Sequence, residues 1–137
     1  MALVDVNQLQ VSFGEKTAVS AASFAIEKGE TFSLIGESGC GKSTLLRVLA
    51  GLQREWNGRI SILGEALRPG RRFEGELRRN VQMVFQDPWA SLHPNHTISR
   101  TLSEPLNIRG EALVMEKVAD ALRQVGLSAD AGKRYPH

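Results

Sequence analysis

The residues with the clearest chemical potential lie together at positions 36 to 44. They follow the pattern G-x-x-x-x-G-K-[ST] and consist of Gly36, Glu37, Ser38, Gly39, Cys40, Gly41, Lys42, Ser43 and Thr44. The glycines permit the tight curl in which successive backbone N–H groups converge on one point. Such a cradle binds clustered anionic oxygens, so the spacing predicts a phosphate-binding loop.

The residues after the last glycine of the loop have separate tasks in this chemistry. A helix beginning near Lys42 would direct unpaired N–H groups and the positive end of its dipole toward the phosphates. The Lys42 ammonium would reach the β- and γ-phosphates, and the Ser43 hydroxyl would join the shell of a Mg²⁺ ion. The sequence therefore predicts a nucleoside triphosphate with Mg²⁺ as the ligand.

Composition limits the remaining possibilities. A chain of 137 residues with 42% apolar residues can supply the core of one domain. The formal charge of +2 is weak support for a nucleic-acid partner. No apolar run approaches the roughly 18 residues of a membrane span, and residues 1–5 lack the pattern of a secretory leader. The single cysteine, Cys40, cannot form an intrachain disulfide. On these grounds we expect a cytosolic protein.

Apolar periodicity predicts the elements around the loop. Alternating apolar positions over 3–13 and 19–26 indicate β structure, and the runs at 31–35 and 81–85 are typical of buried parallel strands. Helices are expected over 43–50, from Thr97 to about Asn107, and over 111–125, with a short strand at 58–64. Interleaved glutamates favour a solvated connecting segment around Arg68, Arg71, Arg72, Arg78 and Arg79.

Three features in this order resemble the first half of an ABC-transporter ATPase. They are an aromatic residue in an N-terminal β region, the phosphate loop, and a glutamine that ends an apolar strand. The stretch from Gln86 to Ile98, QDPWASLHPNHTI, is similar to the ATPases of oligopeptide, dipeptide and nickel importers. The resemblance implies an α/β P-loop NTPase fold. An antiparallel β region would occupy 1–30, the P-loop core 31–86, and the start of a helical subdomain 87–137.

The resemblance also implies roles and partners. Phe13 would stack on adenine, at a position where the family more often has tyrosine, and Gln86 would contact Mg²⁺ and the attacking water. The family acts as a dimer of ATPase subunits, bound to transmembrane permease subunits at the cytoplasmic face of the cell membrane. ATP hydrolysis there drives import, and the resemblance points to peptides or nickel as the cargo. No nucleic-acid partner and no membrane span of its own are expected.

The family pattern continues past a Tyr-Pro-His segment, which Tyr135, Pro136 and His137 resemble, into motifs that these residues do not contain. Those motifs are the signature, the Walker B aspartate, the catalytic glutamate and the switch histidine. Phosphoryl transfer needs several such groups at once, so we expect the 137 residues alone to be inactive. We also expect them to be marginally stable, rearranged or dimerised by strand exchange, because parallel strands need neighbours on both edges.

Two alternative functions stay open at this point. One is a nucleotide-binding or interaction fragment without catalysis, and the other is a different P-loop protein such as a small GTPase or kinase. The lack of an Asn-Lys-x-Asp motif argues against the GTPase. Trp89 is equally compatible with packing on its own domain and on a permease helix. His93 and His96 have too few neighbouring ligands to predict a metal site.

Overall fold

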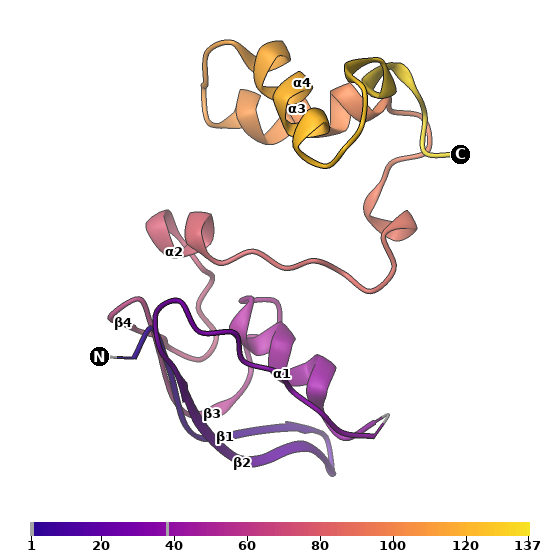
Figure 1. The fold of residues 1–137 in the computed structure, drawn as a ribbon. Helices are drawn as coiled ribbons and strands as arrows, with labels where there is room; N and C mark the ends of the chain where they lie inside the picture. Colours follow the sequence, from indigo (N-terminus) through magenta and orange to yellow (C-terminus); the bar gives the residue numbers. More distant parts are fainter. Residues whose placement is uncertain (1, 38) are drawn as a thin grey trace. The chain divides into compact units, whose positions relative to one another are not determined.

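The computed structural model describes residues 2–37 and 39–137. The chain divides into two compact units, Met1–Met83 and Val84–His137 (Figure 1). The first unit contains the sheet and the predicted phosphate loop. The second unit is helical. Each is described by itself below.

The first unit is built on a four-stranded sheet. Its strands are β1 (Val4–Phe13), β2 (Lys16–Ile26), β3 (Asn57–Ile62) and β4 (Glu65–Ala66), in the order β2-β1-β3-β4. Every pairing is antiparallel, and the turn between β1 and β2 is a short one that contains Gly14. The antiparallel β structure predicted for the start of the chain is confirmed. The sheet also recruits β3 and β4, which follow the phosphate loop in the chain.

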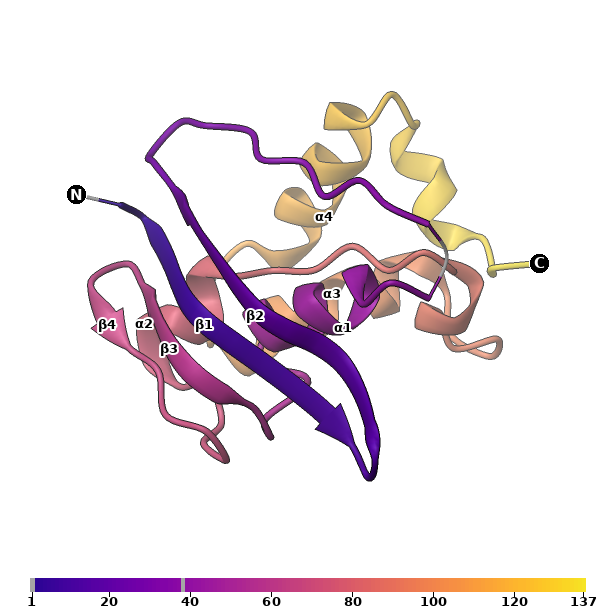
Figure 2. The same cartoon turned by 90° about the horizontal axis from the view of Figure 1, so that it is seen from below.

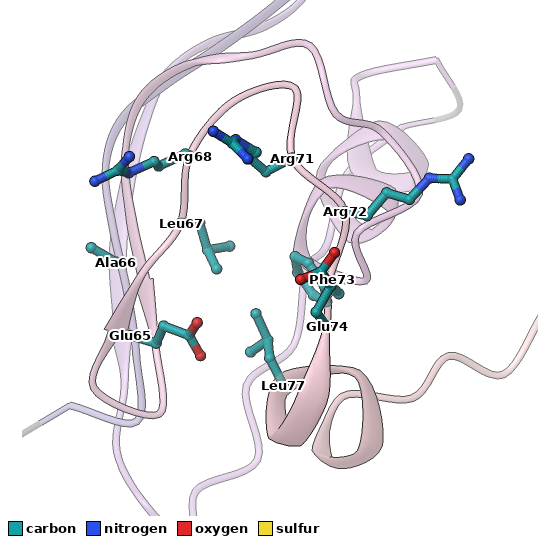
Figure 3. A pocket seen from close by; sticks show the side chains of 9 residues that line it. All are labelled: Glu65, Ala66, Leu67, Arg68, Arg71, Arg72, Phe73, Glu74 and Leu77. Atoms are coloured by element: carbon teal, nitrogen blue, oxygen red, sulfur yellow. The ribbon is translucent and has the colours of Figure 1, made fainter.

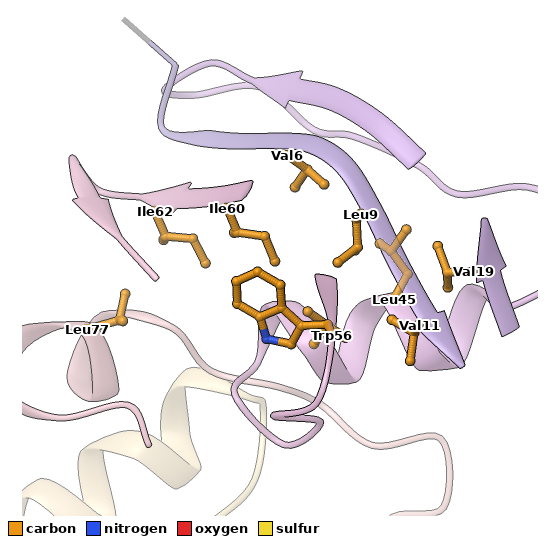
Figure 4. Packing of buried hydrophobic residues seen from close by; sticks show 10 residues of the cluster. Val6, Leu9, Val11, Val19, Leu45, Trp56, Ile60, Ile62 and Leu77 are labelled. Carbon is orange, nitrogen blue, oxygen red and sulfur yellow. The ribbon is translucent and has the colours of Figure 1, made fainter. Parts of the chain in front are cut away.

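One face of the sheet carries the core of this unit. Helix α1 (Lys42–Leu49) packs there, and Figure 2 shows β1 and β2 side by side in front of it. The buried side chains come from alternating strand positions and from one stripe of the helix (Figure 4). They are Val6, Leu9, Val11, Val19, Leu45, Val48, Trp56, Ile60, Ile62 and Leu77. Burying such a set supplies the main stabilisation of a fold of this size.

A pair of backbone irregularities bends the middle of the long hairpin. Gln8 and Ala21 have φ values of 52° and 51°, where residues other than glycine are uncommon, and the β1–β2 register shifts between Val6 and Leu9. The Gln8 N–H donates to the Ser23 hydroxyl at 2.9 Å. The irregularity places the Gln8 carbonyl against β3. A Cβ added to Gly58 would lie 2.5 Å from that oxygen.

This contact predicts that Gly58→Ala destabilises the protein more than its backbone angle alone requires. Gly64 is the matched control, because its φ of 78° is also positive but a Cβ there would meet nothing within 4 Å. We expect Gly64→Ala to lower the free energy of unfolding by about 1 kcal/mol. Gly58→Ala should cost roughly 2 kcal/mol more, since the strand must shift to admit the methyl group. Urea unfolding followed by far-ultraviolet circular dichroism measures both; equal losses would contradict the packing argument.

The strands predicted at 31–35 and 81–85 are not formed, so both predictions are wrong for the described chain. Each segment runs without a ladder partner among residues 2–37 and 39–137. A strand exists through its hydrogen-bonded neighbour, and an apolar run supplies the side chains but not that neighbour. As a result Ile35 and Val84 are 95% and 96% exposed. The short helix α2 (Gly75–Asn80), which buries Leu77, was not predicted.

The second unit is a small helical assembly. It contains the short 3₁₀ helices η1 (Trp89–Ser91) and η2 (Ala129–Lys133) and the longer helices α3 (Ile98–Ile108) and α4 (Val114–Gln124). Thr97 begins α3 as predicted, because its hydroxyl accepts the Arg100 N–H at 3.2 Å. The buried residues of α4 are Val118 and Leu122, one turn apart on the predicted apolar stripe. No helix of the described residues is long and apolar enough to cross a membrane.

Candidate functional site

The predicted phosphate loop ends where α1 begins. Gly41 is the N-cap of α1 with φ 97°, and the Leu45 N–H donates to the Gly41 carbonyl at 2.9 Å. No side chain of the described residues caps this helix end. The first backbone N–H groups of α1 therefore stay available, and the helix dipole adds positive potential at the same point. This is the arrangement that binds a phosphate group.

The Lys42 side chain turns back into the loop. Its ammonium donates to the carbonyl oxygens of Gly36 and Glu37, the latter at 3.2 Å. Within the described chain no carboxylate forms an ion pair with it. The positive charge is thus held at the centre of the loop by neutral groups. It remains uncompensated and can attract an anion strongly.

The loop rests against the sheet at one point of close contact. A Cβ at Gly41 would overlap the carbonyl oxygen of Ala18 and would lie 3.3 Å from Cγ2 of Val19. Its positive φ is a second reason for glycine here. The start of α1 therefore packs closely against β2. Gly41 meets two requirements: it adopts the positive φ that the loop needs, and it leaves room for the Ala18 carbonyl.

Cys40 lies inside the curl. Its Sγ is 2.7 Å from the position that a Cβ of Gly36 would occupy, and the side chain is exposed. A group attached to this sulfur would fill the space that phosphates need. Ser43 is exposed at the first turn of α1, and Thr44 is half-buried behind it. Ser38 was also predicted to line the site, but it lies outside the described residues.

The position of Cys40 predicts that alkylation blocks nucleotide entry. After complete reaction with N-ethylmaleimide, we expect the affinity for magnesium-ATP to fall at least about tenfold, because the adduct overlaps the anion cradle. Isothermal calorimetry measures the affinity before and after reaction. The Cys40→Ala variant is the control and should bind equally well with and without the reagent. Unchanged affinity of the fully alkylated chain would overturn the prediction.

An apolar cavity of about 360 Å³ opens beside the loop. Lys42 and Ser43 lie at its edge, and Phe24, Phe32, Leu34 and Leu46 are among its apolar walls. The rings of Phe24 and Phe32 stack with their centroids 5.0 Å apart. The walls include two residues of the segment 31–35, which was predicted to be a buried strand. The cavity therefore adjoins the phosphate cradle through Lys42 and Ser43.

Phe13 and Gln86 belong to different units. Phe13 ends β1 beside the β1–β2 turn, and the residue is 50% exposed, which leaves its ring accessible for stacking. The hairpin turn and the loop lie at the same end of the sheet (Figure 1). Gln86 is exposed and lies in the unit Val84–His137. Its predicted contact with Mg²⁺ and water stays a prediction.

The two histidines for which the sequence predicts no metal site pack against each other. The rings of His93 and His96 stack with their centroids 4.0 Å apart, and the Asn95 N–H donates to Nδ1 of His93 at 3.2 Å. Desolvation lowers the pKa of His96, and the charges of Arg100 and His93 lower it further. No group of three metal-ligating side chains occurs among the described residues.

The arginine-rich connecting segment encloses a separate cavity of about 320 Å³ (Figure 3). Leu67 and Leu77 point into it, and the guanidinium of Arg72 points away. The remaining lining residues are Glu65, Ala66, Arg68, Arg71, Phe73 and Glu74. Carboxylates and guanidinium groups both line this cavity. The mixture of charges agrees with the predicted solvated segment.

Comparison with known proteins identifies the class. The family model described as ABC transporter matches residues 19–136. This range contains the whole phosphate loop and all of the helical unit except His137. The chain therefore belongs to the ABC transporter family. The resemblance predicted from the loop and the segment after Gln86 is confirmed. The fold class is confirmed with it: an ABC ATPase domain with an antiparallel sheet and several helices.

Several similar proteins are named as ATP-binding proteins of peptide transport. The chain is 43% identical to the oligopeptide transport ATP-binding protein AmiF of Streptococcus pneumoniae serotype 4, over 98% of this chain and 47% of that protein. It is 40% identical to the putative oligopeptide transport ATP-binding protein YkfD of Bacillus subtilis, over 98% of this chain and 44% of that protein. It is 43% identical to the di/tripeptide transport ATP-binding protein DppF of Pseudomonas aeruginosa, over 88% of this chain and 38% of that protein. The chain thus spans less than half the length of these relatives.

Proposed function

We propose that this chain is the ATP-binding part of an importer ATPase and that its loop binds ATP with Mg²⁺. The observation that carries the proposal is the Lys42 ammonium at the N-terminus of α1, which has no carboxylate partner among the residues that the structure describes. Two sources of positive potential converge there on a curled backbone. A triphosphate is a ligand whose charge and size match such a cradle.

The predicted binding residues have distinct tasks in this proposal. Lys42 pairs with the β- and γ-phosphates, and the loop amides bind the phosphate oxygens. Ser43 and Gln86 hold Mg²⁺, Gln86 also orients the attacking water, and Phe13 stacks on the adenine. The cofactor-binding set is Phe13, Gly36, Glu37, Ser38, Gly39, Cys40, Gly41, Lys42, Ser43 and Thr44.

The names of the relatives support peptides as the transported class. AmiF and YkfD are described as oligopeptide and DppF as di/tripeptide transport proteins. We infer that the chain acts with a second ATPase subunit and with transmembrane permease subunits, at the cytoplasmic face of the membrane. In that assembly ATP hydrolysis would drive import. Nickel, the other cargo predicted from sequence, has no support in these names.

Turnover requires more groups than these 137 residues hold. The loop, Lys42 and Gln86 would supply positioning and charge, but the family's signature, catalytic glutamate and switch histidine do not occur in this 137-residue sequence. We infer that the chain by itself binds nucleotide without hydrolysing it. Phosphate release from magnesium-ATP at a rate above the buffer background would contradict this inference.

The proposal predicts that Lys42→Ala removes measurable binding of magnesium-ATP. Loss of the ammonium removes a charge-assisted contact in the centre of the loop, and we expect affinity to fall about 100-fold or more. Calorimetry on the complete chain measures the effect. Lys28→Ala is the matched control, since Lys28 is an exposed lysine in the turn after β2, at the other end of that strand. Equal affinity of Lys42→Ala and Lys28→Ala would refute the proposed function.

The role of Ser43 gives a second test. If its hydroxyl binds Mg²⁺, Ser43→Ala should lose the gain in ATP affinity that Mg²⁺ produces, while affinity for metal-free ATP stays within about twofold. Titrations with Mg²⁺ and with a chelator present provide the comparison. Ser33→Ala is the control, because Ser33 is an exposed serine in the preceding segment. A full Mg²⁺ effect in Ser43→Ala would remove this residue from the metal site.

A further inference from the structure

The register of the β1–β2 hairpin places a lysine opposite the predicted adenine-stacking residue. Phe13 pairs with Lys16, and Ser12 pairs with Thr17 in the preceding position. The Ser12 and Thr17 hydroxyls lie 3.4 Å apart, in hydrogen-bond contact. Directly opposed residues of an antiparallel pair share one face of the sheet. Phe13 and Lys16 are therefore neighbours on the face opposite to that hydroxyl pair.

That face is the one on which α1 packs. Val11 precedes Phe13 by two positions and thus shares its face, and Val11 is buried in the core with Leu45 of α1 (Figure 4). The partner of Val11 is Val19, because Ala18 is an additional residue in β2 at this point. Phe13 and Lys16 consequently continue the row of Val11 and Val19 beyond the edge of the core. Both side chains are exposed there.

The phosphate loop reaches the same row. Gly41 contacts the Ala18 carbonyl and Val19, as described above. Ala18 is two residues from Lys16, or roughly 7 Å along the strand. The Lys16 side chain is long enough to bridge that separation. No carboxylate of the described residues forms an ion pair with Lys16.

From this placement we propose that Lys16 is a further nucleotide-binding residue, which pairs with the phosphate nearest the base. The inference rests on the proposed function, because it takes Phe13 and the loop as the two ends of one nucleotide site. Lys16 directly opposes Phe13 and lies two residues from Ala18, where the loop meets β2, so a nucleotide that spans from the Phe13 ring to the Lys42 ammonium would pass within reach of Lys16. Its innermost phosphate is the anionic group nearest that cation. In this arrangement Lys42 pairs with the β- and γ-phosphates, and Lys16 pairs with the phosphate nearest the base.

The test compares ligands with and without phosphate on the complete chain. For Lys16→Ala we expect affinity for magnesium-ATP and for ADP to fall about three- to tenfold, the range of an exposed charge-assisted contact. Adenosine, which has no phosphate, should bind Lys16→Ala as it binds the unaltered chain. Lys16→Arg should retain affinity for ATP within about twofold, because it preserves the charge. Calorimetry serves for ATP and ADP, and ligand-observed nuclear magnetic resonance serves for adenosine.

The controls separate this inference from the proposed function. Lys28→Ala removes the same charge from the opposite end of β2 and should bind ATP normally. If Lys42→Ala loses ATP and Lys16→Ala does not, the inference about Lys16 is wrong and the proposed function stands. If adenosine and ATP weaken equally in Lys16→Ala, the residue supports the hairpin and not the phosphate, which also overturns the inference. If Lys42→Ala binds ATP normally, the proposed function itself fails.

Discussion

The contact between Gly41 and the backbone of β2 determines the geometry of the candidate site. The glycine has to accept a left-handed φ and leave room for the Ala18 carbonyl at the same time. This contact fixes where α1 begins and therefore where its free N–H groups point. Behind it, Val19, Leu45 and Val48 are buried together in the core, so the position of the helix follows from the packing of the sheet. The chemistry of Lys42 depends on this support.

Two apolar segments of the described chain lack such support from a neighbouring strand. Residues 31–35 and 81–85 have the composition of buried strands, yet Ile35 and Val84 are almost fully exposed. Backbone hydrogen bonds between strands are what convert such segments into a sheet. The first segment contributes Leu34 to the edge of the core, so it is held in part by side-chain packing. Exposed apolar segments of this kind favour association with a further strand.

The two units divide the proposed tasks. The unit Met1–Met83 contains the phosphate cradle, Phe13 and the sheet, and the unit Val84–His137 contains Gln86 and Trp89. The join between them lies in an apolar segment that directly precedes Gln86.

The sequence by itself determined the loop, its helix and the β character of the first strands, because these depend on local patterns. Gly41, Lys42 and Ser43 are recognisable by spacing, and Thr97 by its position before an apolar stripe. The strands at 31–35 and 81–85 could not be judged in this way, since a strand depends on a partner distant in the chain. Only the tertiary structure decided that β3 and β4 pair with β1 and β2 in one four-stranded sheet. It also decided that Lys16 lies beside Phe13, because the pairing of β1 with β2 depends on where the two-residue turn at Gly14 and Glu15 forms.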